Sequence, residues 1–76
     1  MFTIELVIVR GRDHPEVVER TLSPRHFLYD AEHRAKTMLS EARRRFPDNP
    51  PDGYQILNEE GAVVARFSRA TASRSR

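Results

Sequence analysis

Three histidines are the side chains of this sequence best suited to bind a metal ion or to move a proton: His14, His26 and His33. His26 and His33 are seven residues apart, which places them on one side of a helix but about 10 Å apart along its axis. A metal-binding pair on a helix needs ligands four residues apart. We therefore expect surface histidines, with no metal site and no cofactor.

Hydroxyl and carboxylate side chains could support catalysis. Ser23, Thr37 and Ser40 are possible nucleophiles, but none lies in a nucleophile-elbow sequence or has a base at a recognisable spacing. The loop carboxylates lack the spacing of a calcium loop, and turn formation explains them; they are Asp48, Asp52, Glu59 and Glu60. Because no phosphate-binding glycine pattern is present either, the sequence predicts a protein that is not an enzyme.

Arginine gives the main electrostatic signal. Residues 1–67 hold ten Arg and Lys against eleven acidic residues, whereas residues 68–76 hold three Arg and no acid. The positive charge is therefore concentrated at the end of the chain. Six arginines are candidate phosphate contacts for an accessory nucleic-acid-binding protein: Arg43, Arg44, Arg45, Arg69, Arg74 and Arg76. The simpler interpretation is a solvated helix end followed by a solubilising tail, since no aromatic residue is interleaved for base stacking.

Hydrophobic periodicity predicts the first two elements that would position these groups. Residues 1–9 alternate between an apolar side and a mixed side, which predicts a strand. Residues 16–22 are β-branched but heavily charged, which favours a strand at the edge of a sheet.

A helix is predicted to follow over residues 24–46. Ser23 is a suitable N-cap and Pro24 fits the first helical position. Apolar residues then recur every three or four positions, and Pro47 ends the pattern. This helix would be about 34 Å long, longer than strands of about 20 to 30 Å. We favour the start at Pro24, with Asp30 as a second plausible start.

The segment 53–67 predicts a β-hairpin. Two β-rich runs flank Asn58-Glu59-Glu60-Gly61, in which glycine suits the positive φ that closes a three-residue loop. Residues 68–76 are Ser, Arg, Ala and Thr without periodicity and predict a disordered basic tail. The chain therefore divides into a single domain over 1–67 and a tail over 68–76.

Together these elements predict an α+β fold of ββαββ layout, with a four-stranded sheet and one long helix on one face. The first and last strands are apolar on both sides, so we place them centrally and predict the strand order 2-1-4-3. The uncovered face is then expected to hold either scattered surface hydrophobic residues, which are normal, or an apolar patch for self-association: Val7, Val9, Tyr54, Ile56 and Val64.

The layout resembles a class of short bacterial proteins without an assigned activity. The resemblance rests mainly on the hairpin, Gly-Tyr-x-Ile-x-Asn-Glu-x-Gly-x-x-Val-x-Arg over residues 53–66. It implies a ββαββ domain and carries no catalytic or binding residue over to this chain. A high ratio of Arg to Lys is also typical of a GC-rich bacterial genome.

Size and composition complete the expectation. A chain of 76 residues without Cys has a small core and no disulfide, so pairing with a second copy is a common source of stability. No apolar run approaches the length of a membrane span, and the N-terminus does not read as a signal peptide, so we expect a cytoplasmic protein. We predict a non-enzymatic protein-interaction module that forms a homodimer through the open sheet face or an edge strand, with nucleic-acid binding as the alternative.

Overall fold

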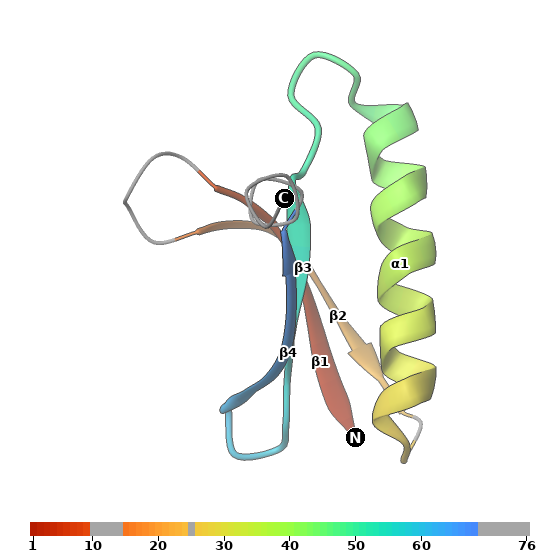
Figure 1. Cartoon of the computed structure of the whole chain (residues 1–76), viewed down its shortest axis with the longest axis vertical. Helices are drawn as coiled ribbons and strands as arrows, with labels where there is room; N and C mark the ends of the chain where they lie inside the picture. The colour runs from red at the N-terminus through yellow and green to blue at the C-terminus, as the bar shows by residue number, and fades with distance from the viewer. Residues whose placement is uncertain (10–14, 25, 69–76) are drawn as a thin grey trace, which may run out of the picture.

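The computed structural model describes residues 1–9, 15–24 and 26–68. The element order is β1 (Phe2–Ile8), β2 (Glu16–Ser23), α1 (Leu28–Arg45), β3 (Gly53–Leu57) and β4 (Val63–Ser68). The strands form one four-stranded antiparallel sheet, and α1 packs against one of its faces (Figure 1). The predicted α+β class and ββαββ layout are confirmed.

The strand order is β2-β1-β3-β4, so the predicted order 2-1-4-3 is wrong. β3 is the second central strand and β4 lies at an edge, and every neighbouring pair is antiparallel. β3 is mostly buried and β4 mostly exposed, which suits a central and an edge position. Asp52, immediately before β3, adds two hydrogen bonds to the pairing of β3 with β1. Its N–H donates to the Val7 carbonyl (2.8 Å) and its Oδ2 accepts from the Val9 N–H (2.9 Å), which fastens the start of β3 beside β1.

α1 begins at Leu28 with Phe27 as N-cap, so neither Pro24 nor Asp30 starts it. Ser23 is not the cap, because it is the last residue of β2 and is fully buried. No side-chain cap hydrogen bond is made at Phe27. The shorter helix, 18 residues or about 27 Å, matches the strands. Its end agrees with the prediction, with Phe46 as C-cap directly before Pro47.

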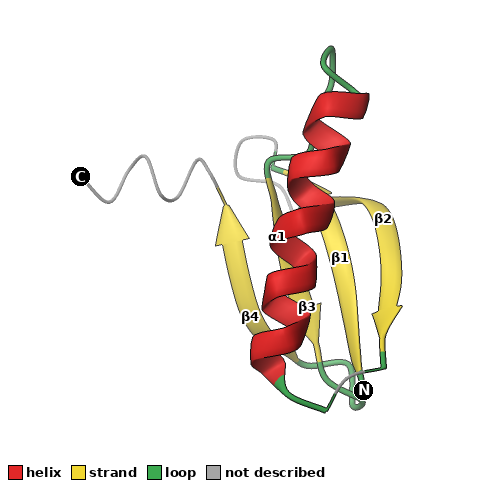
Figure 2. Ribbon diagram, turned by 90° about the vertical axis from the view of Figure 1, so that its right-hand side faces the viewer, coloured by secondary structure: helices red, strands yellow, loops and turns green. Residues whose placement is uncertain are grey.

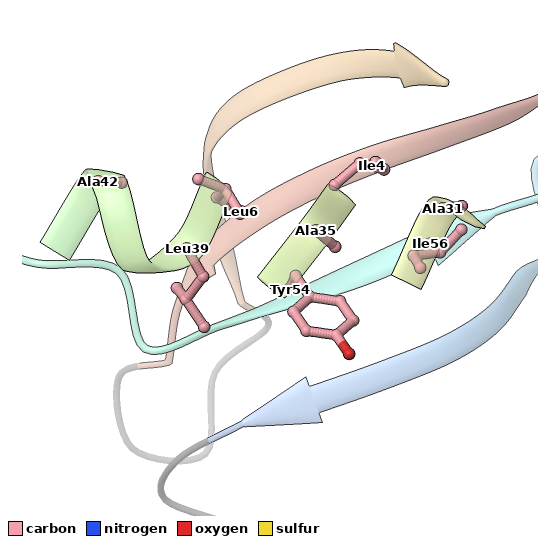
Figure 3. Packing of buried hydrophobic residues seen from close by; sticks show 8 residues of the cluster. All are labelled: Ile4, Leu6, Ala31, Ala35, Leu39, Ala42, Tyr54 and Ile56. Carbon is pink, nitrogen blue, oxygen red and sulfur yellow. The ribbon is translucent and has the colours of Figure 1, made fainter. Parts of the chain in front are cut away.

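The core lies between α1 and the two central strands. It contains Ile4 and Leu6 of β1, Tyr54 and Ile56 of β3, and four residues of the helix (Figure 3): Ala31, Ala35, Leu39 and Ala42. Three of the helix residues are alanines, so the helix axis can lie close to the sheet. In Figure 2 the helix crosses the middle of the sheet, and β2 and β4 extend beyond it on either side.

The β3–β4 hairpin closes as predicted. Gly61 has a φ of 85°, and its N–H donates to the Asn58 carbonyl (3.0 Å). Asn58 Oδ1 accepts from the N–H groups of Glu60 (2.9 Å) and Ala62 (3.0 Å). Asn58 thus organises the turn through its own side chain. β4 continues to Ser68, one residue past the predicted domain boundary, and residues 69–76 lie outside the described part.

Gly53 lies where the backbone of β4 leaves no room for a side chain on β3. A Cβ atom there would lie 2.0 Å from the Phe67 carbonyl oxygen and 2.8 Å from the Ser68 Cα. Both are backbone atoms, so β4 itself would have to move. A side chain at Gly61 would meet nothing within 4 Å, although its positive φ would be strained.

We predict that Gly53→Ala destabilises the domain by at least about 2 kcal/mol, because the new methyl group collides with the neighbouring strand. Gly61→Ala is the matched control and should cost about 1 kcal/mol, the penalty of a left-handed conformation. Urea unfolding of both variants measures the difference. Equal losses for the two variants would contradict the close β3–β4 approach.

Candidate functional site

The sheet has an open face, which is the face turned away from α1. No element of the described residues covers it (Figure 1). The strand registers place one row of polar residues across its middle: Arg20, Glu5, Gln55 and Arg66, one from each strand. This polar row is the most organised chemical feature of the open face.

Glu5 is the centre of the polar row, and its side chain is only 6% exposed. Its Oε2 accepts from Arg20 Nε (2.8 Å) and Nη2 (2.7 Å), and its Oε1 accepts from Gln55 Nε2 (2.7 Å). A buried carboxylate is costly unless it is paired and hydrogen-bonded. Both oxygens are satisfied here, so the sheet holds this charge without a covering layer.

Aliphatic side chains lie on both sides of the polar row. Leu22, Thr3, Leu57 and Val63 form the row on one side, and Val17 stands opposite Val7 on the other. Each edge strand also has an irregularity in its register, where Val18 and Val64 are the extra residues. Several of these side chains are exposed, and Leu22 is the most open at 60%. The polar row, whose central charge is already paired, is therefore flanked on both sides by aliphatic side chains.

A shallow hollow of about 500 Å³ lies at the hairpin end of the open face. It runs from Met1 and Thr3 past Glu5 and Arg20 to the turn at Asn58 and Glu59. Since Glu5 is already engaged by Arg20 and Gln55, its carboxylate contributes to structure.

Two members of the predicted self-association patch are misplaced. Tyr54 and Ile56 face α1 and belong to the core, because the register aligns them with Leu6 and Ile4 on the covered face. Val7 does lie on the open face, although it is buried. Val9 is half-buried beyond the end of β1, and Val64 is exposed on β4.

The arginines at the helix end are partly engaged in local contacts. Arg43 Nη1 donates to the Pro51 carbonyl (2.9 Å), which ties the loop before β3 to the helix. The Arg45 guanidinium lies 5.8 Å from the centre of the Phe46 ring, within cation–π range. Arg44 is exposed. Three further predicted phosphate contacts lie outside the described residues: Arg69, Arg74 and Arg76.

The other candidate residues do not converge. His26 and His33 are exposed, and His14 lies outside the described part of the chain. The Thr37 hydroxyl donates to the His33 carbonyl (3.2 Å), and the Ser23 hydroxyl is buried without a hydrogen-bond partner among the described residues. Within residues 1–9, 15–24 and 26–68, no group of three or more metal-ligating side chains occurs.

A second surface feature lies on the covered side of the sheet, where α1 leaves β4 exposed. This groove of about 250 Å³ is lined by Lys36, Leu39, Ser40, Arg43, Tyr54 and Phe67. The rings of Tyr54 and Phe67 are stacked, with centroids 5.7 Å apart. Burial, and secondly the charge of Glu32, raises the pKa of Tyr54 above its ordinary value of 10.0.

The sequence did not reveal the polar row. Glu5 interrupts an apolar strand, which is a signal that its carboxylate has a dedicated partner. The identity of that partner depends on register, because a shift of one residue would turn Arg20 or Gln55 to the other face.

No protein-family description, curated protein or solved structure matches this chain. The resemblance to short bacterial proteins therefore stays a prediction. Among the described residues, no helix has both the length and the apolar character needed to cross a membrane.

We predict a strong energetic coupling between Glu5 and Arg20. In a double-mutant cycle with Glu5→Gln and Arg20→Gln, the coupling energy should be about 1 to 2 kcal/mol, since one partner is buried and receives two hydrogen bonds. The matched cycle with Arg66→Gln, in the same row but without a direct contact to Glu5, should give less than about 0.5 kcal/mol. Urea unfolding of the variants provides the energies, and equal coupling in the two cycles would contradict the geometry.

We also predict an alkaline loss of stability that depends on Tyr54. The folded-state pKa of Tyr54 is raised, so the unfolded chain loses this proton first and stability falls as the pH rises past about 10. Tyr54→Phe should reduce this fall, whereas Tyr29→Phe, at a tyrosine that is 75% exposed, should leave it unchanged. Unfolding at neutral and alkaline pH measures the effect. The same alkaline slope in the wild type and Tyr54→Phe would disprove the assignment.

Proposed function

We propose that this protein is a non-enzymatic interaction module that forms a homodimer through its open face. One observation carries the proposal: exposed aliphatic side chains surround a polar row whose central charge is already paired within the chain. A second copy can cover this face without leaving the Glu5 carboxylate unsatisfied.

The energetic argument favours burial of the open face. Fully burying a valine or leucine side chain contributes about 1.5 to 3 kcal/mol, and five partly exposed aliphatic residues lie on or beside this face: Val17, Val18, Leu22, Val63 and Val64. Association costs about 4 to 15 kcal/mol in lost freedom. The balance is compatible with a dimer of moderate affinity, and a 76-residue chain gains core volume from it.

The arginines at the two ends of the polar row are suited to the solvent-exposed rim of an interface. Arg20 lies on the edge strand β2 and Arg66 on the edge strand β4. Long arginine side chains can keep their guanidinium groups in water while their stems cover apolar surface. A two-fold axis through the middle of the face would therefore bury its centre and leave both arginines at the edge, as in an isologous interface.

The nucleic-acid alternative receives less support. Arg43 and Arg45 already contact Pro51 and Phe46. Of the three arginines at the helix end, Arg44 is therefore the one that is exposed and makes no such contact within the described residues. We therefore do not propose it as a second function.

We predict that Leu22→Lys shifts the protein from dimer to monomer in light scattering at micromolar concentration. The substitution introduces a charge among the aliphatic side chains of the open face. Tyr29→Lys is the matched control, because Tyr29 is also exposed and apolar but lies on α1. It should leave the dimer intact. A wild-type chain that is monomeric, or a Leu22→Lys chain that stays dimeric while folded, would overturn the proposal.

A further inference from the structure

The groove between α1 and β4 is small. Its volume of about 250 Å³ is below the range of about 300 to 1,000 Å³ that is usual for small-molecule pockets. It exists because α1 packs on β1 and β3, which leaves the inner side of β4 open beside the helix (Figure 2).

The lining of the groove combines an apolar floor with a basic rim. Leu39 and the stacked rings of Tyr54 and Phe67 form the apolar part. Lys36 and Arg43 supply two cations about two helical turns apart, with Ser40 between them. Arg43 donates one Nη1 bond to Pro51, and its fork-shaped guanidinium has further donors. The charge of Glu32 contributes, after burial, to the raised pKa of Tyr54.

The edge of the sheet beside this groove can accept another strand. Within the described residues, β4 pairs with β3 alone, and a shallow hollow of about 360 Å³ follows its residues Val63 to Arg66. β4 carries one charged residue, Arg66, whereas the other edge strand, β2, carries Glu16, Glu19 and Arg20. Charges on an edge strand oppose strand addition, so β4 is the less protected edge.

We propose that β4 and the adjacent groove bind an extended acidic segment of a partner protein, which adds to the sheet as a fifth strand. An added strand would lie about 4.8 Å beyond β4, and every second side chain would point to the side of α1. One apolar side chain would enter the groove against Phe67 and Leu39. A carboxylate two residues away would pair with Lys36 or Arg43.

This mode of recognition uses main-chain hydrogen bonds for affinity and a side-chain pocket for specificity. It accounts together for the open edge, the small volume of the groove and its two cations. It goes beyond the proposed dimer, because it uses the edge of β4 and the groove beside α1, whereas the dimer uses the open face.

The test uses a synthetic peptide with threonine at every second position. The positions between are filled by leucine and glutamate in turn. We expect it to shift the backbone amide signals of β4 in a ¹⁵N-correlation NMR titration of the full chain. Lys36→Glu should weaken binding about five- to tenfold. Arg34→Glu is the matched control: it makes the same charge reversal on the opposite flank of α1, where Arg34 lines a hollow with Ser23 and Asp30, and it should bind as the wild type does.

A second peptide with lysine in place of glutamate should fail to bind, which tests the charge requirement without altering the protein. The Leu22→Lys variant should bind the acidic peptide unchanged, so a failure of the dimer and a failure of this inference are distinguishable. The inference is overturned if the shifts map to the open face, if the lysine peptide binds equally well, or if Lys36→Glu and Arg34→Glu weaken binding alike. It is also overturned if dilution of the Leu22→Lys variant, in which the proposed dimer is broken, still shifts the β4 signals, because a second copy would then occupy this edge.

Discussion

The whole structure depends on one constraint, which is that a single helix of 18 residues must cover a four-stranded sheet. A helix is about 10 Å wide and strands are about 4.8 Å apart, so one helix covers two strands. The two strands that it covers are β1 and β3. The exposure of β2, β4 and the open face follows from this, and both proposed interaction surfaces are consequences of it.

The chain meets this constraint differently on the two faces of the sheet. On the covered face, alanines let the helix lie close to the fully buried side chains of Ile4, Leu6 and Ile56. On the open face there is no helix, and the buried carboxylate of Glu5 is held by hydrogen bonds from both neighbouring strands. The first arrangement supplies most of the core, and the second fixes the register of three strands across a face that a partner can cover.

Local patterns predicted the elements well, and long-range pairing explains the errors. The hairpin at Gly61 and the helix end before Pro47 depend on neighbouring residues, so sequence reasoning was sufficient there. The strand order was not predictable, because it depends on the pairing of β1 with β3, which lie far apart in the sequence. Tyr54 and Ile56 were assigned to the wrong face, because the register that aligns them with Leu6 and Ile4 decides which side of β3 meets α1. Glu5 was visible as an acid in an apolar strand, but its partners Arg20 and Gln55 become known only from the register.

The central claim is that two copies meet through the open face. An isotope-filtered NOE experiment on an equal mixture of labelled and unlabelled chains tests it most directly, because it detects only contacts between copies. The account predicts intermolecular contacts among the methyl groups of Leu22, Val17 and Val63. It would be contradicted by a dimer whose intermolecular contacts involve Phe67 and the helix side of β4, or by the absence of such contacts at millimolar concentration.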